Sequence, residues 1–142
     1  MTLTDSKIYI DTAPFIYYLE KSNLYFDTAR EFFINCRNQN ADLITSTVTI
    51  EEYCVYPLSR NDEQSIKNFY AFINGMNIKT VSVNENVAIK AAEIRAKYPS
   101  FKALDSIHLA TAILSNCAAF ITNDKQLCQA KEIQVYTMED LK

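Results

Sequence analysis

Short apolar runs alternate along the chain with longer segments whose apolar residues recur at helical spacing. Five runs have the length and composition of buried strands: residues 7–11, 42–46, 78–81, 118–122 and 133–136. The segments between them predict helices at residues 12–20, 24–38, 48–56, 62–74, 85–97, 104–116 and 125–130. Strands that alternate with helices in this way indicate an α/β domain with helices on both faces of a mostly parallel sheet.

Two helix ends are predicted from proline and glycine. Pro57 should stop the helix that begins at residue 48, because proline lacks a backbone N–H and restricts the residue before it. Ile66, Phe69, Tyr70 and Ile73 form an apolar stripe at spacings of three and four, and the stripe should end at Gly75.

Length and composition indicate one domain, residues 1–142. A chain of 142 residues buries about 68–70% of its unfolded surface, which is enough for a core without disulfides or metals. With one Gly and three Pro, the chain has no flexible linker and no glycine-rich phosphate loop. No internal repeat is present, and nucleotide binding through such loops is not expected.

Several classes of protein are not expected. The chain is 49% apolar and 22% charged, it has no run of about 18 apolar residues that would span a membrane, and residues 1–7 do not resemble a signal peptide. A cytoplasmic protein is predicted. The four cysteines, Cys36, Cys54, Cys117 and Cys128, form no C-x-x-C pair and His108 is the single histidine, so reduced and mostly buried thiols are expected rather than a zinc site.

Overall charge argues against nucleic-acid binding. The net charge is −3 and the pI is near 5.1, whereas nucleic-acid-binding domains usually carry a basic surface. The stretch 79–102 holds five basic residues against two acidic ones. It forms either a local basic patch or, as is more common for such clusters, a solvated helix face.

Two acidic residues close predicted strands. Asp11 and Asp124 directly follow apolar runs, and the carboxyl ends of parallel strands are where open α/β sheets bind ligands. Each also precedes a predicted helix, where Asp is a favoured N-cap. Taken singly, each is more often a cap than a ligand.

Two further acids lie on predicted helices. Asp105 opens a helix that is apolar on nearly all sides, so its charge should be paired, neutralised or bound to metal. Glu51 and Glu52 are adjacent, and periodicity does not decide which of them turns inward. His108 is three residues after Asp105 and is either a general base or, more commonly on such a face, a core histidine bonded to Asp105 or to a backbone carbonyl.

Read together, these junctions resemble the PIN domain, a family of metal-dependent nucleases that includes VapC-type toxins. The resemblance rests on four segments in order: residues 8–20 with Asp11, residues 44–52 with a Ser/Thr-rich strand end and Glu52, residues 103–112 with Asp105, and residues 120–124 with Asp124. Alignment with the family favours Glu52 over Glu51. Tyr56 departs from VapC-like chains, which often have glycine before the proline.

The resemblance implies a three-layer α/β/α domain with a five-stranded sheet of order 3-2-1-4-5. It implies that Asp11, Glu52, Asp105 and Asp124 are catalytic, with Asp11 and Asp105 as the main ligands of Mg²⁺ or Mn²⁺. Supporting polar groups are expected to orient water or phosphate: Thr12, Ser46, Thr122 and Asn123. The expected partners are an RNA substrate, a small antitoxin protein and a second copy of the chain.

Three other interpretations are open. One alternative is a solitary PIN nuclease in RNA processing. Another is a non-catalytic α/β interaction module in which the acids are caps and salt-bridge partners. A phosphatase-like metal hydrolase ranks lower, because Asp11 is followed by Thr12 and Ala13 rather than by a second aspartate two residues on.

Overall fold

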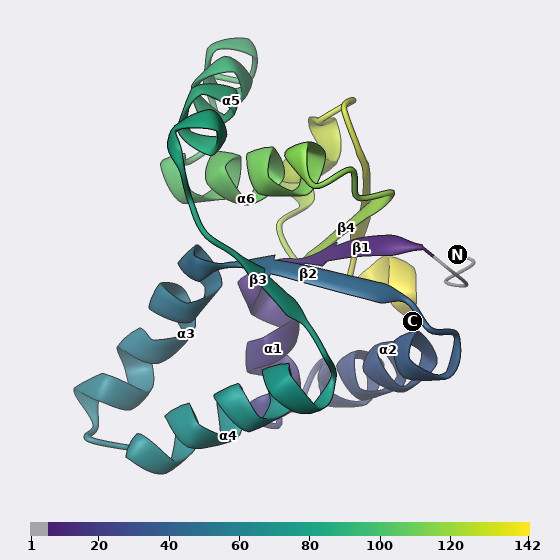
Figure 1. Ribbon diagram of the computed structural model, residues 1–142. Coiled ribbons are helices and arrows are strands. Elements are labelled where there is room, and N and C mark those ends of the chain that lie inside the picture. Colours follow the sequence, from purple (N-terminus) through teal and green to yellow (C-terminus); the bar gives the residue numbers. More distant parts are fainter. Residues whose placement is uncertain (1–5) are drawn as a thin grey trace.

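The computed structural model describes residues 6–142 and contains a five-stranded parallel sheet (Figure 1). Its order is β3-β2-β1-β4-β5, as the family resemblance implied. The strands are β1 (Lys7–Ile10), β2 (Asp42–Ser46), β3 (Lys79–Val81), β4 (Ala119–Thr122) and β5 (Gln134–Thr137).

Six α-helices cover the two faces of the sheet. They are α1 (Thr12–Leu19), α2 (Phe26–Asn38), α3 (Thr47–Ser59), α4 (Glu63–Gly75), α5 (Glu85–Lys97) and α6 (Ala103–Leu114). Two short 3₁₀ helices follow, η1 (Lys125–Gln129) and η2 (Glu139–Leu141). In Figure 1, α5 and α6 lie above the sheet and α1, α2 and α4 lie below it.

Alternating side chains of the central strands build a separate core on each face. Ile8 and Ile10 of β1 pack into the core formed with α1 to α4. Tyr9, between them, belongs to the core formed with α5 and α6. Because successive residues of a strand point to opposite faces, a strand buried on both sides is apolar throughout. This explains why the predicted strands read as continuous apolar runs.

The structure corrects two predicted helix ends. Helix α3 does not stop before Pro57 but continues to Ser59. Pro57 is buried in the last turn, and its carbonyl oxygen accepts bonds from the backbone N–H groups of Arg60 and Asp62 at 3.2 and 2.8 Å. Packing and these bonds offset the N–H that proline lacks.

The end of α4 also differs from the prediction. Gly75 is the last helical residue rather than the residue that breaks the helix. Asn77, two positions later, takes the left-handed conformation with φ of 54°. Asparagine tolerates this conformation better than most residues, so it turns the chain where glycine was expected to do so.

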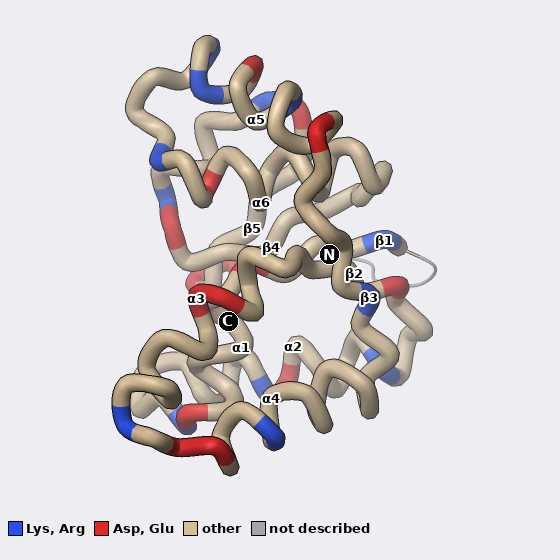
Figure 2. Tube along the Cα trace, turned by 60° about the vertical axis from the view of Figure 1, so that its left-hand side comes forward, with Lys and Arg blue, Asp and Glu red and all other residues tan. Residues whose placement is uncertain are grey.

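The charges on α5 are mixed rather than purely basic (Figure 2). Lys90 pairs with Glu93 at 3.4 Å, and Lys97 pairs with Glu132 at 3.4 Å. These exposed pairs favour the interpretation of this segment as a solvated helix face.

The thiols and the membrane prediction are consistent with a globular domain. The four cysteines are free; Cys36 and Cys54 are buried, Cys117 is partly buried and Cys128 is exposed, so the expectation of mostly buried thiols holds for two of them. Within residues 6–142, no helix is both long enough and apolar enough to cross a membrane.

Candidate metal centre

The central strands bring three chain segments to one edge of the sheet. Strands β2 and β4 both pair in parallel with β1, so their carboxyl ends lie together. Asp11 directly follows β1, and its backbone N–H donates to the carbonyl of Ile121 in β4 at 2.9 Å. Ser46 ends β2 and Thr122 ends β4. The edge predicted to hold the chemistry is therefore assembled from neighbouring strands.

Asp11 is fixed by hydrogen bonds to both of its carboxylate oxygens. Oδ1 accepts from the backbone N–H of Thr12 at 2.7 Å, so Asp11 is indeed the N-cap of α1. Oδ2 accepts from the hydroxyl of Thr122 at 2.7 Å, and the Thr122 hydroxyl accepts from the backbone N–H of Asp124 at 3.1 Å. Asp11 is only 8% exposed. The cap role and a ligand role are compatible, because each oxygen keeps a further lone pair.

Glu52, and not Glu51, faces this edge. Glu51 is exposed, whereas Oε1 of Glu52 accepts from the Thr12 hydroxyl at 2.7 Å and lies 2.6 Å from Nε2 of His108. Burial acts to raise the pKa of Glu52, but the hydrogen bonds from His108 and Thr12 outweigh it and the pKa is lowered. Glu52 is therefore an ionised carboxylate at neutral pH.

Asp105 is the carboxylate whose charge is least compensated. It lies in the first turn of α6 and is half-buried. Burial raises the pKa of Asp105 from 3.8 to about 6, and the negative charges of Asp11, Asp124 and Glu52 contribute to the rise. A shift of this kind is typical of carboxylates that share one site.

Asp124 joins the cluster from the loop that follows β4. Its Oδ1 accepts from the backbone N–H of Gln126 at 3.0 Å, which makes Asp124 the N-cap of η1. Its charge acts on Asp105. Asp11, Glu52 and Asp124, from the ends of β1 and β4 and from α3, thus all act on Asp105 of α6, and Figure 2 shows the acidic segment of α3 near other acidic positions beside the sheet.

His108 is the residue whose role was not foreseen. Its ring is fully buried, as expected of a core histidine, but its partners are neither Asp105 nor a backbone carbonyl. Nδ1 lies 2.5 Å from the Tyr9 hydroxyl, and Nε2 lies 2.6 Å from Glu52 Oε1 and 3.3 Å from Asp11 Oδ1. His108 therefore links the core to two of the four acids.

The donor set fits a divalent cation. Asp11, Glu52 and His108 each offer one ligand atom, and these atoms lie within 4.8 Å of one another. Among residues 6–142, no lysine or arginine forms an ion pair with any of the four clustered acids. Within the described residues, the basic partner of these carboxylates is His108, and such an oxygen-rich cluster attracts a hard cation such as Mg²⁺ or Mn²⁺. This compact group differs from the predicted ligand pair of Asp11 and Asp105, which stays a prediction.

The supporting polar residues are all engaged. Thr12 and Thr122 hold Glu52 and Asp11, as described above. The Ser46 hydroxyl accepts from the backbone N–H of Val48 at 3.1 Å and caps α3. The Asn123 amide donates to the Tyr17 hydroxyl at 2.6 Å. Their predicted action on water or phosphate stays a prediction.

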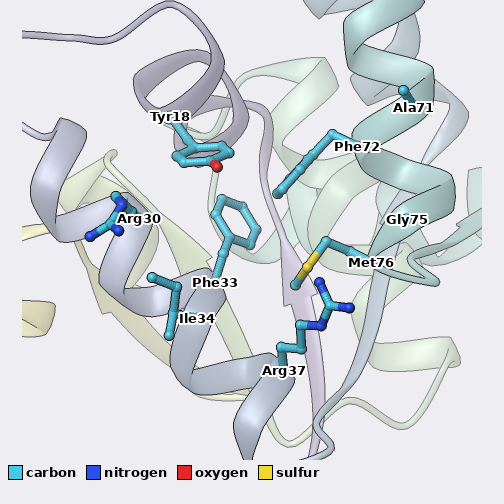
Figure 3. Close-up of a pocket in the computed structure, with 9 residues that line it drawn as sticks. All are labelled: Tyr18, Arg30, Phe33, Ile34, Arg37, Ala71, Phe72, Gly75 and Met76. Atoms are coloured by element: carbon cyan, nitrogen blue, oxygen red, sulfur yellow. The ribbon is translucent and has the colours of Figure 1, made fainter.

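A separate hollow of about 270 Å³ lies between α1, α2 and α4 (Figure 3). It is lined by Tyr18, Arg30, Phe33, Ile34, Arg37, Ala71, Phe72, Gly75 and Met76. The lining is largely apolar, with two arginines and no acid. This hollow therefore contains none of the four clustered acids.

The sheet order and the acidic edge define a PIN domain, and a family comparison agrees. The PIN domain model matches residues 8–133, and the chain belongs to this family. No curated protein matches the chain.

Solved structures with the same fold are VapC-type toxins and their complexes. VapBC2 from Rickettsia felis bound to promoter DNA has a TM-score of 0.75 at 14% identity and covers 92% of this chain and 98% of its own. A toxin–antitoxin complex from Klebsiella pneumoniae has a TM-score of 0.68 at 20% identity, with 92% and 97% covered. VapC20 from Mycobacterium tuberculosis, a toxin that cleaves the sarcin–ricin loop, has a TM-score of 0.65 at 14% identity, with 80% and 86% covered. At these identities the likeness concerns the fold.

Proposed function

We propose that the chain is a metal-dependent endoribonuclease that hydrolyses RNA phosphodiester bonds, and that it is the toxin of a toxin–antitoxin pair. The observation that carries the proposal is the gathering of Asp11, Glu52, Asp105 and Asp124 at the carboxyl edge of a PIN sheet, where no lysine or arginine of residues 6–142 pairs with them. Membership of the PIN family and the fold shared with toxins support it.

The contacts of each residue support a distinct proposed role. Asp11 and Asp105 would hold the Mg²⁺ or Mn²⁺ ion, with Asp124 beside them. The bound ion would lower the pKa of water and neutralise charge on the phosphate. Glu52 is a partly exposed carboxylate at the edge, so it would bind the ion through water or position the attacking water, as would Asp124. Thr12 and Thr122 keep the two carboxylates oriented.

Purified protein should cleave a mixed structured RNA in the presence of Mg²⁺ or Mn²⁺. Cleavage should fall to background after chelation and return when the metal is supplied again, because the acids alone cannot activate water. The measurement is the initial rate by gel electrophoresis, with metal binding followed by calorimetry. Chelator-resistant cleavage would point to a contaminating nuclease, and absence of both cleavage and metal binding would favour a non-catalytic interaction module.

The proposed partner is a small antitoxin protein whose tail occupies the groove at the acidic edge. This part of the proposal rests on the toxin–antitoxin complexes that share the fold. A solitary nuclease in RNA processing is the alternative. Co-expression with the protein encoded next to the chain distinguishes them: a toxin should yield a stable complex in which cleavage is inhibited.

The proposed second partner is another copy of the chain. Val55, Tyr56 and Leu58 of α3 are 58%, 58% and 62% exposed and form an apolar ridge close to Glu52. If this ridge forms the dimer contact, Leu58→Lys should raise the dimer dissociation constant at least about tenfold, because a charge would be desolvated there. Leu24→Lys, at a leucine that is 65% exposed elsewhere, is the matched control. Sedimentation velocity that shows equal association for both variants would reject this contact.

A further inference from the structure

A buried chain of hydrogen bonds connects the core of the sheet to the acidic edge. It runs from the Tyr9 hydroxyl to Nδ1 of His108 at 2.5 Å, and from Nε2 of His108 to Oε1 of Glu52 at 2.6 Å. Tyr9 and His108 are both 0% exposed. These hydrogen bonds join three separate elements, β1, α6 and α3. Of the three side chains, Glu52 is the one that reaches solvent.

The direction of the second bond follows from the chemistry of its partners. A glutamate carboxylate, whose ordinary pKa is about 4.3, is ionised at neutral pH and only accepts hydrogen bonds, and Oε1 of Glu52 already accepts one from the Thr12 hydroxyl. Nε2 of His108 must therefore carry a proton and donate it to Glu52. This holds for a neutral ring, in which Tyr9 donates to Nδ1, and for a charged ring, in which Nδ1 donates to Tyr9.

The Tyr9 end of the chain is held rigidly. Its ring stacks on Phe120 with a centroid distance of 5.1 Å and an interplanar angle of 4°, and it meets the His108 ring edge-on at 5.7 Å. Both Tyr9 and Phe120 lie in paired central strands of the sheet. A ring that is packed in this way fixes the orientation of the imidazole to which it is bonded.

The consequence appears at Glu52. The Thr12 hydroxyl and His108 Nε2 both bond to the same oxygen, Oε1. Two donors on one oxygen fix the plane of the carboxylate and leave Oε2 for water or a cation. Without His108, a glutamate on the first half of α3 with 29% side-chain exposure would sample several rotamers.

We propose that His108, anchored by Tyr9, is a positioning residue that holds Glu52 in its working orientation. The inference rests on the proposed nuclease function for its kinetic consequence but not for its structural one. Although Nε2 of His108 lies close enough to Asp11 and Glu52 to share a cation with them, we assign it no place as a metal ligand, because Nε2 donates its proton to Glu52 and Nδ1 is bonded to Tyr9.

Nitrogen NMR tests the structural part without any RNA or metal. His108 is the only histidine of the chain, so ¹⁵N-histidine labelling gives one pair of ring signals. We expect a protonated Nε2 whose proton is shifted downfield by the bond to Glu52, and Glu52→Gln should move that signal. A bare Nε2, or a signal unchanged in Glu52→Gln, would overturn the inference. Mg²⁺, which unlike Mn²⁺ is diamagnetic, can be added in the same experiment. Loss of the Nε2 proton on its addition would show that His108 is a metal ligand and would also overturn the inference.

Kinetics test whether His108 acts through Glu52. His108→Leu should lower kcat about 10- to 100-fold, the usual effect of removing an outer partner of a site carboxylate, with KM for RNA changed less than about twofold. His108→Gln, which keeps an N–H donor, should recover part of the loss. In a Glu52→Gln background, His108→Leu should have no further effect. An equal loss in both backgrounds would overturn the inference.

Tyr9→Phe provides a milder variant if the buried His108 substitutions do not fold. It should lower kcat and shift the Nδ1 resonance while ring packing on Phe120 is retained. Tyr25→Phe is the matched control, since the buried Tyr25 also bonds a carboxylate, that of Glu139 at 2.8 Å, away from the acidic edge. Equal kinetic effects of the two variants would count against the inference. If the wild-type protein cleaves no RNA, the proposed function fails, and the NMR result still decides the role of His108.

Discussion

Asp11→Asn is expected to lower metal-dependent RNA cleavage by about 10³-fold or more while the protein stays folded. The substitution removes one negative charge from the centre of the acidic edge, and loss of a single charge-stabilising group at an active site commonly costs about 10²–10³ in kcat. Loss of a residue that binds the ion itself should lower kcat by at least that much. Asparagine is as good an N-cap as aspartate, so the bond from the Thr12 backbone N–H to position 11 is retained.

The measurement is the initial rate of RNA cleavage at saturating Mg²⁺, together with the thermal unfolding midpoint. Asp62→Asn is the matched control: Asp62 is the N-cap of α4 and bonds Ser65, outside the acidic edge. It should cleave RNA at the wild-type rate. Wild-type activity of Asp11→Asn would remove Asp11 from the proposed ligand set and, with it, the main support for metal catalysis.

The backbone of this site was predictable from sequence because it follows from local rules. Short segments of four or five residues with apolar or β-branched side chains predicted every strand, and Asp11 and Asp124 follow β1 and β4 as expected. Parallel strands bring such residues to one edge whatever their separation in sequence. The order of the strands was not a local property, and it came from the resemblance to PIN domains.

The side-chain contacts were not predictable in the same way. Adjacent glutamates on a helix differ by about 100° in direction, and the apolar neighbours of Glu51 and Glu52 did not decide between them. Packing of α3 against α1 and α6 turns Glu52 inward, toward Thr12 and His108. For His108, Asp105 was the predicted nearby partner, but Tyr9 and Glu52, to which its ring is bonded, lie 99 and 56 positions away.

The structure also shows why a single acid could not reveal the site. Asp11, Asp124 and Ser46 each cap a helix, so each has a sufficient structural reason to be present. The joint effect of Asp11, Asp124 and Glu52 on Asp105 distinguishes a ligand site from a set of caps. In the metal-free protein, the negative charges of these carboxylates repel one another, and a bound cation would reduce this repulsion.

Asp105→Asn is expected to lower RNA cleavage and to raise the stability of the metal-free protein. Cleavage should fall as for Asp11→Asn, whereas the metal-free protein should become more stable. The pKa of Asp105 rises from 3.8 to about 6 on folding, so folding holds a proton on this group more tightly than the unfolded chain does. Ionisation therefore destabilises the folded state, and stability is lost as pH rises from about 4 to about 6.

The free energy of unfolding of metal-free Asp105→Asn should exceed that of wild type by about 1–2 kcal/mol at pH 7. A rise of about two units corresponds to about 3 kcal/mol, which is reduced here because the side chain is partly exposed to solvent. The unfolding midpoint in chelator should rise by about 3–6 °C. The gain should be complete above pH 6 and should disappear below about pH 4, where wild-type Asp105 is protonated in both states.

Asp42→Asn is the control for this measurement, because Asp42 is an exposed aspartate at the start of β2 and its neutralisation should change stability by less than about 0.5 kcal/mol. Addition of Mg²⁺ should then reverse the order of the variants. A ligand that binds only the folded state raises its stability, so wild type should gain more from Mg²⁺ than Asp105→Asn does. If Asp105→Asn is less stable than wild type in chelator at pH 7, the carboxylate is satisfied by the fold itself, and the charge repulsion on which a cation site depends is absent.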